Sequence, residues 1–269
     1  MGADTPLSSI TRRDIEAFIT YMLDREQSAP ATVNRHLACL RRMFNIALTD
    51  EWEDAPDHFP KIRQPKERGA RQYFMSSTDE GAIFAQVLAL DTVRLGPEGG
   101  IPRKRDAHRY YVLFTFLVET GLRLGEALGL QWVEVSRPEG GDPMLKLFRP
   151  EALKTGKPRS VPLTQKALES LQSCKGVKGG PFADLDARRA HDIWTRAKAA
   201  AGITRRDCVI HSLRHTCASR LLESGVDLKI VKEWLGHSVI TTTDGYTHLA
   251  THQLTAAAVG LEKLRTRGT

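Results

Sequence analysis

Apolar residues recur along the first 52 positions at the spacing of helices that bury one face. Residues 8–26 begin with Ser and Thr residues suited to an N-cap. The apolar residues that follow recur every three or four positions and are Ile15, Phe18, Ile19 and Met22. Residues 28–51 repeat the pattern, with Pro30 near the predicted helix start. The stripe of this second segment comprises Val33, Leu37, Leu40, Met43, Phe44 and Ala47. The pattern predicts two amphipathic helices.

The opposite face of the second predicted helix carries three arginines, Arg35, Arg41 and Arg42. Taken alone, such charges indicate a solvated helix face more often than a binding surface. They become candidate DNA contacts only if the neighbouring part of the chain handles DNA.

The helical pattern stops at residues 59–72, which contain two prolines, a glycine and five basic residues. Pro and Gly interrupt helices, and the charges keep the segment solvated, so this stretch is typical of an interdomain linker. We therefore expect two domains, a helical one at residues 1–70 and a second one at residues 71–269.

The second predicted domain mixes helices with a few short strands. Residues 76–90 and 106–121 have helical patterns, and helical patterns dominate again from residue 165 onward. Strand patterns run at residues 130–135, 143–150 and 159–164, the last two joined by a turn at residues 151–157. The sequence thus predicts a mainly α fold with one small antiparallel β-sheet.

Charge is distributed unevenly between the two predicted domains. The net charge of the chain is +7, but residues 1–70 carry 10 basic against 11 acidic residues, and residues 71–269 carry 29 against 21. A basic second domain favours a polyanionic partner such as nucleic acid, although charge alone leaves this open.

Several classes of protein do not fit the composition. The longest apolar run, residues 110–118, is too short to span a membrane, and the first residues lack the pattern of a secretory signal. The four cysteines are scattered along the chain, at Cys39, Cys174, Cys208 and Cys217. This spacing favours reduced thiols in a cytosolic protein over disulfides or a zinc site.

Two stretches place cations where they could meet an anion. In "TGLRLGEALGL", Arg123 and Glu126 lie three apart among apolar neighbours; this is either an ordinary helical pair or an arginine preorganised for an oxyanion. In "LKTGKPRSVPL", Lys154, Lys157 and Arg159 cluster at a predicted hairpin. Charged hairpin tips are usually solvated, yet a lysine there could act as a general acid.

Two further stretches add histidines and a tyrosine. In "HSLRHTCASRLL", His211, Arg214 and His215 share a helix face; the zinc-protease motif would need Glu in place of Ser212, and Arg214 would repel a cation. In "EWLGHSVITTTDGYTHL", a short helix ends at a glycine that is followed by His237, and Tyr246 comes later. That helix could also be half of a helix-turn-helix DNA reader, with Tyr246 as packing.

The combination is more specific than any of its parts. Two arginines, a lysine, two histidines and a tyrosine supply guanidinium groups, proton-transfer groups and an oxygen nucleophile, with neither paired carboxylates nor a phosphate-binding glycine loop. Such a set suits attack on a phosphodiester without metal, because positive side chains neutralise the transition state.

In their order and spacing, "TGLRLGEALGLQW", "KTGKPRSVPL", "HSLRHTCASRLLESG" and "LGHSVITTTDGYTHL" resemble the motifs of tyrosine recombinases of the phage integrase family, and the similarity spans nearly the whole chain. The resemblance implies site-specific DNA recombination through a 3′-phosphotyrosyl link, with no cofactor and no metal. It also implies a helical core-binding domain and a mixed catalytic domain that form a C-shaped clamp around duplex DNA.

The resemblance assigns a role to each matching residue. Arg123 and Arg214 would hold the scissile phosphate, and His237 would bind a non-bridging oxygen. Tyr246 would attack, assisted by His211, and Lys154 rather than Lys157 would protonate the leaving 5′ oxygen. Glu126 would support Arg123, and the remaining basic candidates would contact DNA: Arg35, Arg41, Arg42, Lys157 and Arg159.

The resemblance also implies partners. The chain would act as a tetramer on double-stranded attachment sites, exchanging C-terminal helices at residues 253–264 between protomers, with accessory DNA-bending proteins where needed. It would work in the cytoplasm at the nucleoid, as a bacterial or phage-encoded protein. Two alternatives stay open at this point: a type IB topoisomerase-like enzyme, and a DNA-binding regulator without catalysis.

The chain departs from the family pattern in places. Ser212 stands where many members have Asp, and Gly245 before Tyr246 is unusual. The first domain has two predicted helices where the family usually has four or more, so we expect a shortened core-binding domain. The loop at residues 95–106 is longer than usual. None of these departures removes a reacting group.

Overall fold

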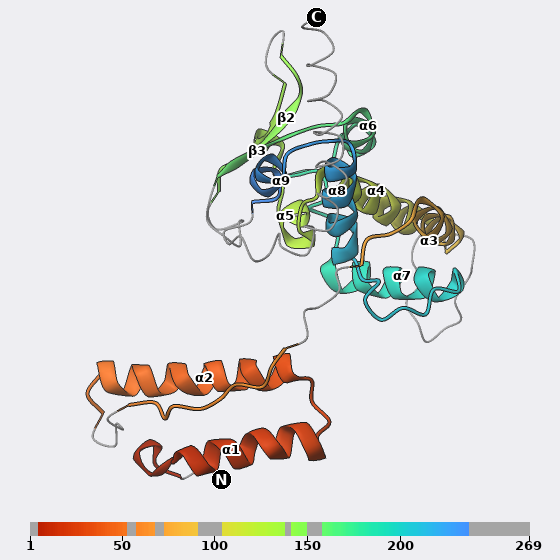
Figure 1. Ribbon diagram of the computed structural model, residues 1–269. Helices are drawn as coiled ribbons and strands as arrows, with labels where there is room; N and C mark the ends of the chain where they lie inside the picture. Colours follow the sequence, from red (N-terminus) through yellow and green to blue (C-terminus); the bar gives the residue numbers. More distant parts are fainter. Residues whose placement is uncertain are drawn as a thin grey trace, which may run out of the picture. The chain divides into compact units, whose positions relative to one another are not determined.

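The computed structural model describes residues 5–52, 58–67, 73–90, 104–137, 141–149 and 158–236. The chain divides into two compact units, Met1–Ala70 and Arg71–Thr269, each with its own core (Figure 1). Within the described residues, no helix combines the length and the apolar content that crossing a membrane requires.

The first unit consists of two long helical segments. Its elements are η1 (Leu7–Ser9), α1 (Arg12–Thr20), a π-helical turn (Tyr21–Arg25) and α2 (Pro30–Thr49). Helix α1 begins at a capping box, because Thr11 and Asp14 each bond the other's backbone N–H, and α2 begins at Pro30 in its first turn.

The core of the first unit confirms most of the predicted apolar faces. Ile15 and Val33 are fully buried, and Phe59 and Ile62 of the following extended segment pack against the same cluster. Met43, predicted on the apolar stripe, is 47% exposed. The buried stripe of α2 is therefore narrower than its sequence pattern.

The second unit is built around one buried helix. It contains α3 (Ser77–Ala89), α4 (Lys104–Thr120), α5 (Leu124–Leu128), η3 (Trp132–Glu134), α6 (Gln165–Ser173), α7 (Ala187–Ala200), α8 (His211–Glu223) and α9 (Leu228–Leu235). Helix α4 packs against α3, α6, α7 and α8, and its side chains Phe114 and Phe116 are fully buried. The predicted mainly α fold is confirmed.

The predicted small antiparallel sheet is also present. Its strands are β1 (Val135–Ser136), β2 (Met144–Leu147) and β3 (Arg159–Pro162), in the order β1-β2-β3. Leu145 pairs with Val161, and both are fully buried, whereas their neighbours Lys146 and Ser160 are exposed. The first strand is shorter than predicted, because a 3-10 turn occupies Trp132–Glu134.

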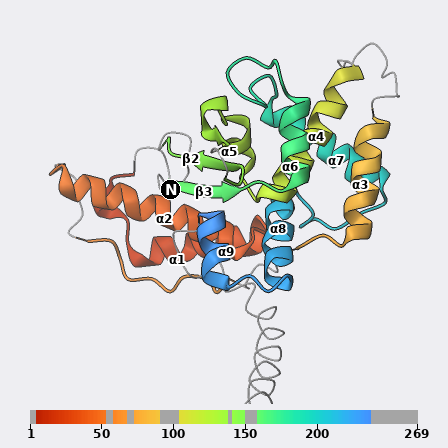
Figure 2. The same cartoon turned by 90° about the horizontal axis from the view of Figure 1, so that it is seen from above.

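Helix α9 packs against both β3 and α8 and lies next to both in the two views (Figures 1 and 2). Asp227 caps its first turn by accepting from the backbone N–H of Lys229. Val231 and Leu235 are buried against α8, whereas the apolar side chain of Ile230 is 53% exposed. A helix of two turns buries only one narrow stripe, and Ile230 lies outside it.

Candidate active site

Glu126 and Arg123 form a closely coupled pair at the start of α5. Arg123 is the N-cap residue, and its backbone N–H donates to Glu126 Oε2 over 2.9 Å. Its guanidinium Nη1 donates to Glu126 Oε1, also over 2.9 Å. The Glu126 side chain is 3% exposed and that of Arg123 is 20% exposed, so the carboxylate is buried while the arginine still reaches solvent. The pair is more than an ordinary exposed helical contact.

A second arginine shares the same carboxylate. Arg159 Nη2 donates to Glu126 Oε2 over 2.7 Å, and its Nη1 lies 3.4 Å from Oε1. The Arg159 side chain is 6% exposed. Burial by itself raises the pKa of Glu126, but the hydrogen bonds and charges of Arg159 and Arg123 outweigh it and keep this pKa below its ordinary value. One buried carboxylate therefore faces two guanidinium groups.

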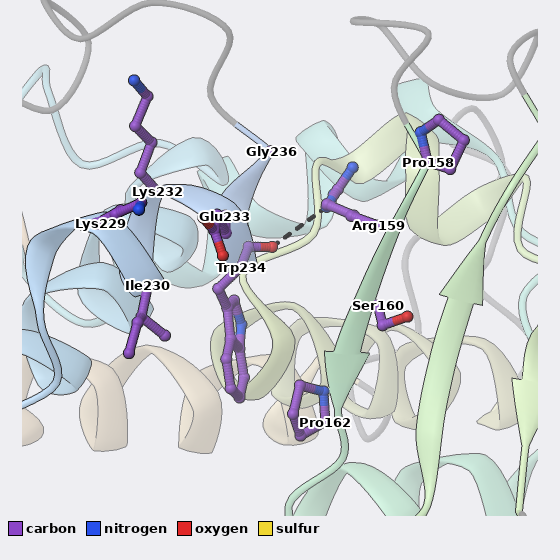
Figure 3. Close-up of a pocket in the computed structure, with 10 residues that line it drawn as sticks. All are labelled: Pro158, Arg159, Ser160, Pro162, Lys229, Ile230, Lys232, Glu233, Trp234 and Gly236. Atoms are coloured by element: carbon purple, nitrogen blue, oxygen red, sulfur yellow. Dashed lines mark hydrogen bonds between the residues drawn. The ribbon is translucent and has the colours of Figure 1, made fainter.

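Arg159 also binds the end of α9. Its Nε donates to the backbone carbonyl of Trp234 over 3.2 Å, the contact drawn in Figure 3. Arg159 and Trp234 line a groove of about 760 Å³ between β3 and α9, together with Lys229, Lys232 and other residues of these two elements. Strand β3 and the last turn of α9 are thus joined by one side chain.

Arg214 on α8 is 2% exposed and binds two backbone carbonyls. Its Nη1 donates to the Gly121 carbonyl over 2.6 Å, and its Nη2 donates to the Leu235 carbonyl. Trp234 Nε1 adds a further bond to the Thr120 carbonyl, over 2.9 Å. The turn before Arg123, helix α8 and the end of α9 are consequently held together.

Two glycines make this close approach possible. Gly121 and Gly236 both have φ of +66°, the left-handed region in which other residues are strained. A Cβ at Gly121 would lie 2.7 Å from Leu235 Cδ2, and one at Gly236 would lie 2.9 Å from Arg159 Cδ. Gly236 ends α9, as predicted from its position before His237.

His211 and His215 face each other at the start of α8. Their rings are 4.9 Å apart between centroids and nearly perpendicular. Burial, the neighbouring His211 and the charge of Arg214 lower the pKa of His215 to about 4. His211, the predicted proton-transfer residue, is exposed.

Ser212, the departure noted in the sequence, has a local structural role. Its hydroxyl donates to the Asp207 carbonyl over 2.9 Å and accepts from the Val209 N–H over 3.1 Å. These bonds order the chain that leads into α8, so the serine satisfies backbone groups beside His211.

Four of the predicted site residues lie outside the described residues: Lys154, Lys157, His237 and Tyr246. Pro158 and Gly236, the described residues next to Lys157 and His237, both line the groove at Arg159. In the first unit, Arg35, Arg41 and Arg42 are exposed on α2, and the Arg41 guanidinium lies 5.0 Å from the centre of the Phe59 ring.

The described part of the site is a cluster of arginines that bind Glu126 and backbone carbonyls of the same unit. Arginine donors in a partly buried setting suit an anionic oxygen, because their charge is little screened and their geometry is fixed in advance. Among the described residues, no group of three or more His, Cys, Asp or Glu side chains is placed to share a metal ion.

Sequence reasoning placed Arg159 on a solvated hairpin tip and did not foresee its contacts with Glu126 and Trp234. A signal was available in the strand pattern. Side chains at alternate positions of a strand share a face, and Val161 and Leu163 are the apolar positions after Arg159. The alternation puts Arg159 on the buried face.

Comparison with known proteins agrees with this geometry. The sequence profile described as "Phage integrase family" matches residues 100–253, more than half of the chain. The chain belongs to the phage integrase family. It is a site-specific recombinase of the tyrosine type, as the motifs predicted, and neither the topoisomerase-like enzyme nor the non-catalytic regulator is favoured.

Two relatives of this integrase-family chain illustrate the likeness. Tyrosine recombinase XerD of Lacticaseibacillus casei is 31% identical over 259 residues, which cover 90% of this chain and 80% of the relative. Tyrosine recombinase XerD of Brucella abortus is 32% identical over 242 residues, which cover 84% and 74%.

Solved structures of recombinases share the fold. The XerH site-specific recombinase bound to a palindromic difH substrate matches with a TM-score of 0.66 and 20% identity, over 94% of this chain and 73% of that one. A lambda integrase dimer bound to a core site matches with a TM-score of 0.64 and 20% identity, over 91% and 82%.

Proposed function

We propose that this recombinase cleaves and rejoins duplex DNA through Tyr246, without a metal ion. The observation that carries the proposal is the cluster in which Glu126 binds Arg123 while Arg214 binds the carbonyl of Gly121, two residues earlier. Two arginines that are far apart in the sequence are thereby tied to one turn. Guanidinium groups fixed in this way suit the charge that develops on a reacting phosphate.

The proposed chemistry exchanges one phosphodiester bond for another. The Tyr246 oxygen attacks the phosphorus, forming a 3′-phosphotyrosyl bond while the bond to the 5′ oxygen breaks. His211 assists removal of the tyrosine proton, and Lys154 gives a proton to the leaving 5′ oxygen. Because the link conserves the energy of the phosphodiester, a 5′ hydroxyl can attack it and restore a DNA strand.

The remaining cations stabilise the phosphate and the duplex. Arg123 and Arg214 hold the non-bridging oxygens with His237. The first unit acts as the core-binding domain, with Arg35, Arg41 and Arg42 of α2 toward the DNA backbone, and Lys157 adds a contact from the hairpin.

The recombinase works as a tetramer on attachment sites, with C-terminal helices exchanged between protomers and accessory proteins that bend the DNA. It acts in the cytoplasm on a chromosome or a mobile element. The proposal of DNA as partner is supported by the basic second domain and by the similar folds of recombinases that are bound to a difH substrate and to a core site.

A strand-exchange assay tests the proposal. Covalent capture from fragmented DNA of the source organism identifies the target site, and two duplexes that carry it in different flanks are then incubated with the protein in EDTA. We expect duplexes with exchanged flanks. Relaxation of supercoiled DNA without exchange would indicate a topoisomerase-like enzyme, and binding without any cleavage would indicate a regulator.

A further inference from the structure

Arg159 contacts two elements of the site although it belongs to a third. It is the first residue of β3 and lies two positions after Lys157 in the sequence. Its guanidinium binds Glu126 at the start of α5 and the Trp234 carbonyl in the last turn of α9. In Figure 3 its side chain extends from β3 toward the end of α9.

The Arg159 side chain lies in a buried and closely packed position. The side chain is only 6% exposed, and the left-handed Gly236 packs against it so closely that a Cβ there would lie 3.0 Å from Arg159 Nη1. Arg159 Nη1 and Nη2 bind the Glu126 carboxylate and its Nε binds the Trp234 carbonyl, so each nitrogen of this guanidinium already has an acceptor within the protein. The charge of Arg159 is therefore paired with a carboxylate, whereas Arg214 binds uncharged backbone carbonyls. The contacts of Arg159 determine where Glu126 and the end of α9 lie.

The charge balance of the cluster gives Arg159 a second effect. Glu126 carries one negative charge and binds both Arg123 and Arg159. With Arg159 present, the three side chains keep one net positive charge. Without it, Glu126 cancels the charge of Arg123, the residue proposed to hold the phosphate.

We infer that Arg159 is a positioning residue for strand cleavage and not a direct DNA contact. It directs the Glu126 carboxylate toward Arg123, leaves Arg123 electrostatically available to the phosphate, and fixes the helix end that His237 follows. This inference rests on the proposed cleavage function.

Substitution by lysine tests the geometry. Lysine keeps the charge but lacks the planar set of donors that reaches a carboxylate and a carbonyl together. In Arg159→Lys we expect the first-order cleavage rate at saturating protein to fall about 10- to 100-fold on a nicked duplex that traps the covalent adduct. The Kd for DNA should change by less than about threefold, because on this inference Arg159 does not contact the DNA backbone.

Arg109→Lys is the matched control. Arg109 also joins a carboxylate and a backbone carbonyl, through Asp184 at 2.6 Å and Pro181 at 2.8 Å, but it contacts none of the site residues. Thermal melts of both variants report the general cost of losing such an arginine. We expect similar melting temperatures and a much slower cleavage rate in Arg159→Lys alone.

A second substitution that restores the net charge distinguishes a positioning role of Arg159 from a general loss of stability. Arg159→Gln should cleave slowly because Glu126 then neutralises Arg123. Adding Glu126→Gln restores one net positive charge, so the double variant should cleave no more slowly than Arg159→Gln alone. If Arg159→Gln and Glu126→Gln each damaged the structure independently, their losses of cleavage rate would instead multiply in the double variant.

Several results would overturn the inference. Cleavage by Arg159→Lys at the native rate would do so, as would equal loss of rate in Arg109→Lys. Weaker DNA binding with an unchanged saturated rate would identify a direct DNA contact. Failure of the native chain to form any adduct would overturn the proposed function and this inference together, whereas the other results leave the proposed function intact.

Discussion

At the scale of single residues, the site depends on one buried carboxylate that pairs with two arginines. Glu126 is 3% exposed on its side chain, and its partners Arg123 and Arg159 are 20% and 6% exposed. Buried ion pairs add little net stability when intact, but removal of one partner leaves an uncompensated charge. Glu126 should therefore be intolerant of truncation.

We expect Glu126→Ala to lower the free energy of unfolding by about 3 kcal/mol, because two arginines would lose their counter-charge. Chemical denaturation measures the loss. Asp192→Ala is the control, since Asp192 is 62% exposed and pairs with Arg196 at 3.8 Å; it should change stability by less than about 0.5 kcal/mol. Equal losses in the two variants would contradict the account of Glu126.

His215 makes stability depend on pH. Its pKa is about 4 in the folded chain against 6.5 in the unfolded chain, so between these values the unfolded state binds more protons. Stability should fall as pH is lowered from 6.5 toward 4, by on the order of 2 kcal/mol from this residue. Denaturation of the native chain and of His215→Asn across this range isolates the effect. An unchanged pH slope in the variant would contradict it.

At the scale of elements, the site is assembled where short segments end against one another. The turn after α4, the start of α5 and the end of α9 are joined by Arg214, Arg159 and Trp234. Gly121 allows this contact, because its conformation and the nearby Leu235 leave no room for a side chain.

We expect Gly121→Ala to destabilise the protein by about 2–3 kcal/mol more than Gly202→Ala, because only Gly121 adds overpacking to backbone strain. Both glycines have positive φ, of +66° and +73°, but a Cβ at Gly202 would meet no atom within 4 Å. Thermal or chemical unfolding of the two variants makes the comparison. Equal destabilisation would show that Leu235 yields without cost.

Local patterns predicted most of these elements. The apolar spacing indicated α1, α2, α4 and α9, and the Gly after the apolar run marked the end of α9. The alternation after the hairpin indicated β3. The 3-10 turn at Trp132–Glu134 was missed because its apolar residues also fit a strand, and periodicity cannot separate the two over a few positions.

Contacts between distant segments could not be predicted in the same way. Arg214 binds carbonyls 93 and 21 positions away, and Arg159 binds a carboxylate 33 positions away. No local rule encodes such distances. The family resemblance proposed Arg123, His211 and Arg214 as site residues and Glu126 as the support of Arg123. The backbone partners of Arg214 and the contact of Arg159 with Glu126 became visible only in three dimensions.

At the scale of the whole molecule, the uneven charge suggests how the units share the work. The first unit has a net charge of −1 and the second has +8, so the second supplies most of the attraction for a polyanion. Contacts from the first unit then depend on where its arginines lie and not on its overall charge.

We expect the DNA affinity to fall steeply with salt, and the double variant Arg35→Gln/Arg42→Gln to reduce the slope of log K against log salt by about 2. The control Arg12→Gln/Arg13→Gln removes the same charge from α1. Filter binding or fluorescence anisotropy at several salt concentrations measures both. Equal slopes for the two double variants would mean that the arginines of α2 make no contact with the DNA backbone that those of α1 lack.

The central claim is that Tyr246 becomes covalently linked to DNA, and adduct formation on a nicked duplex of the captured target sequence tests it most directly. With EDTA present, the native chain should give a protein–DNA band that resists denaturing electrophoresis, and peptide mapping should place a 3′-phosphate on Tyr246. Tyr246→Phe should bind the same duplex and form no adduct. An adduct that persists in Tyr246→Phe, or one that forms only with a divalent metal, would contradict the account.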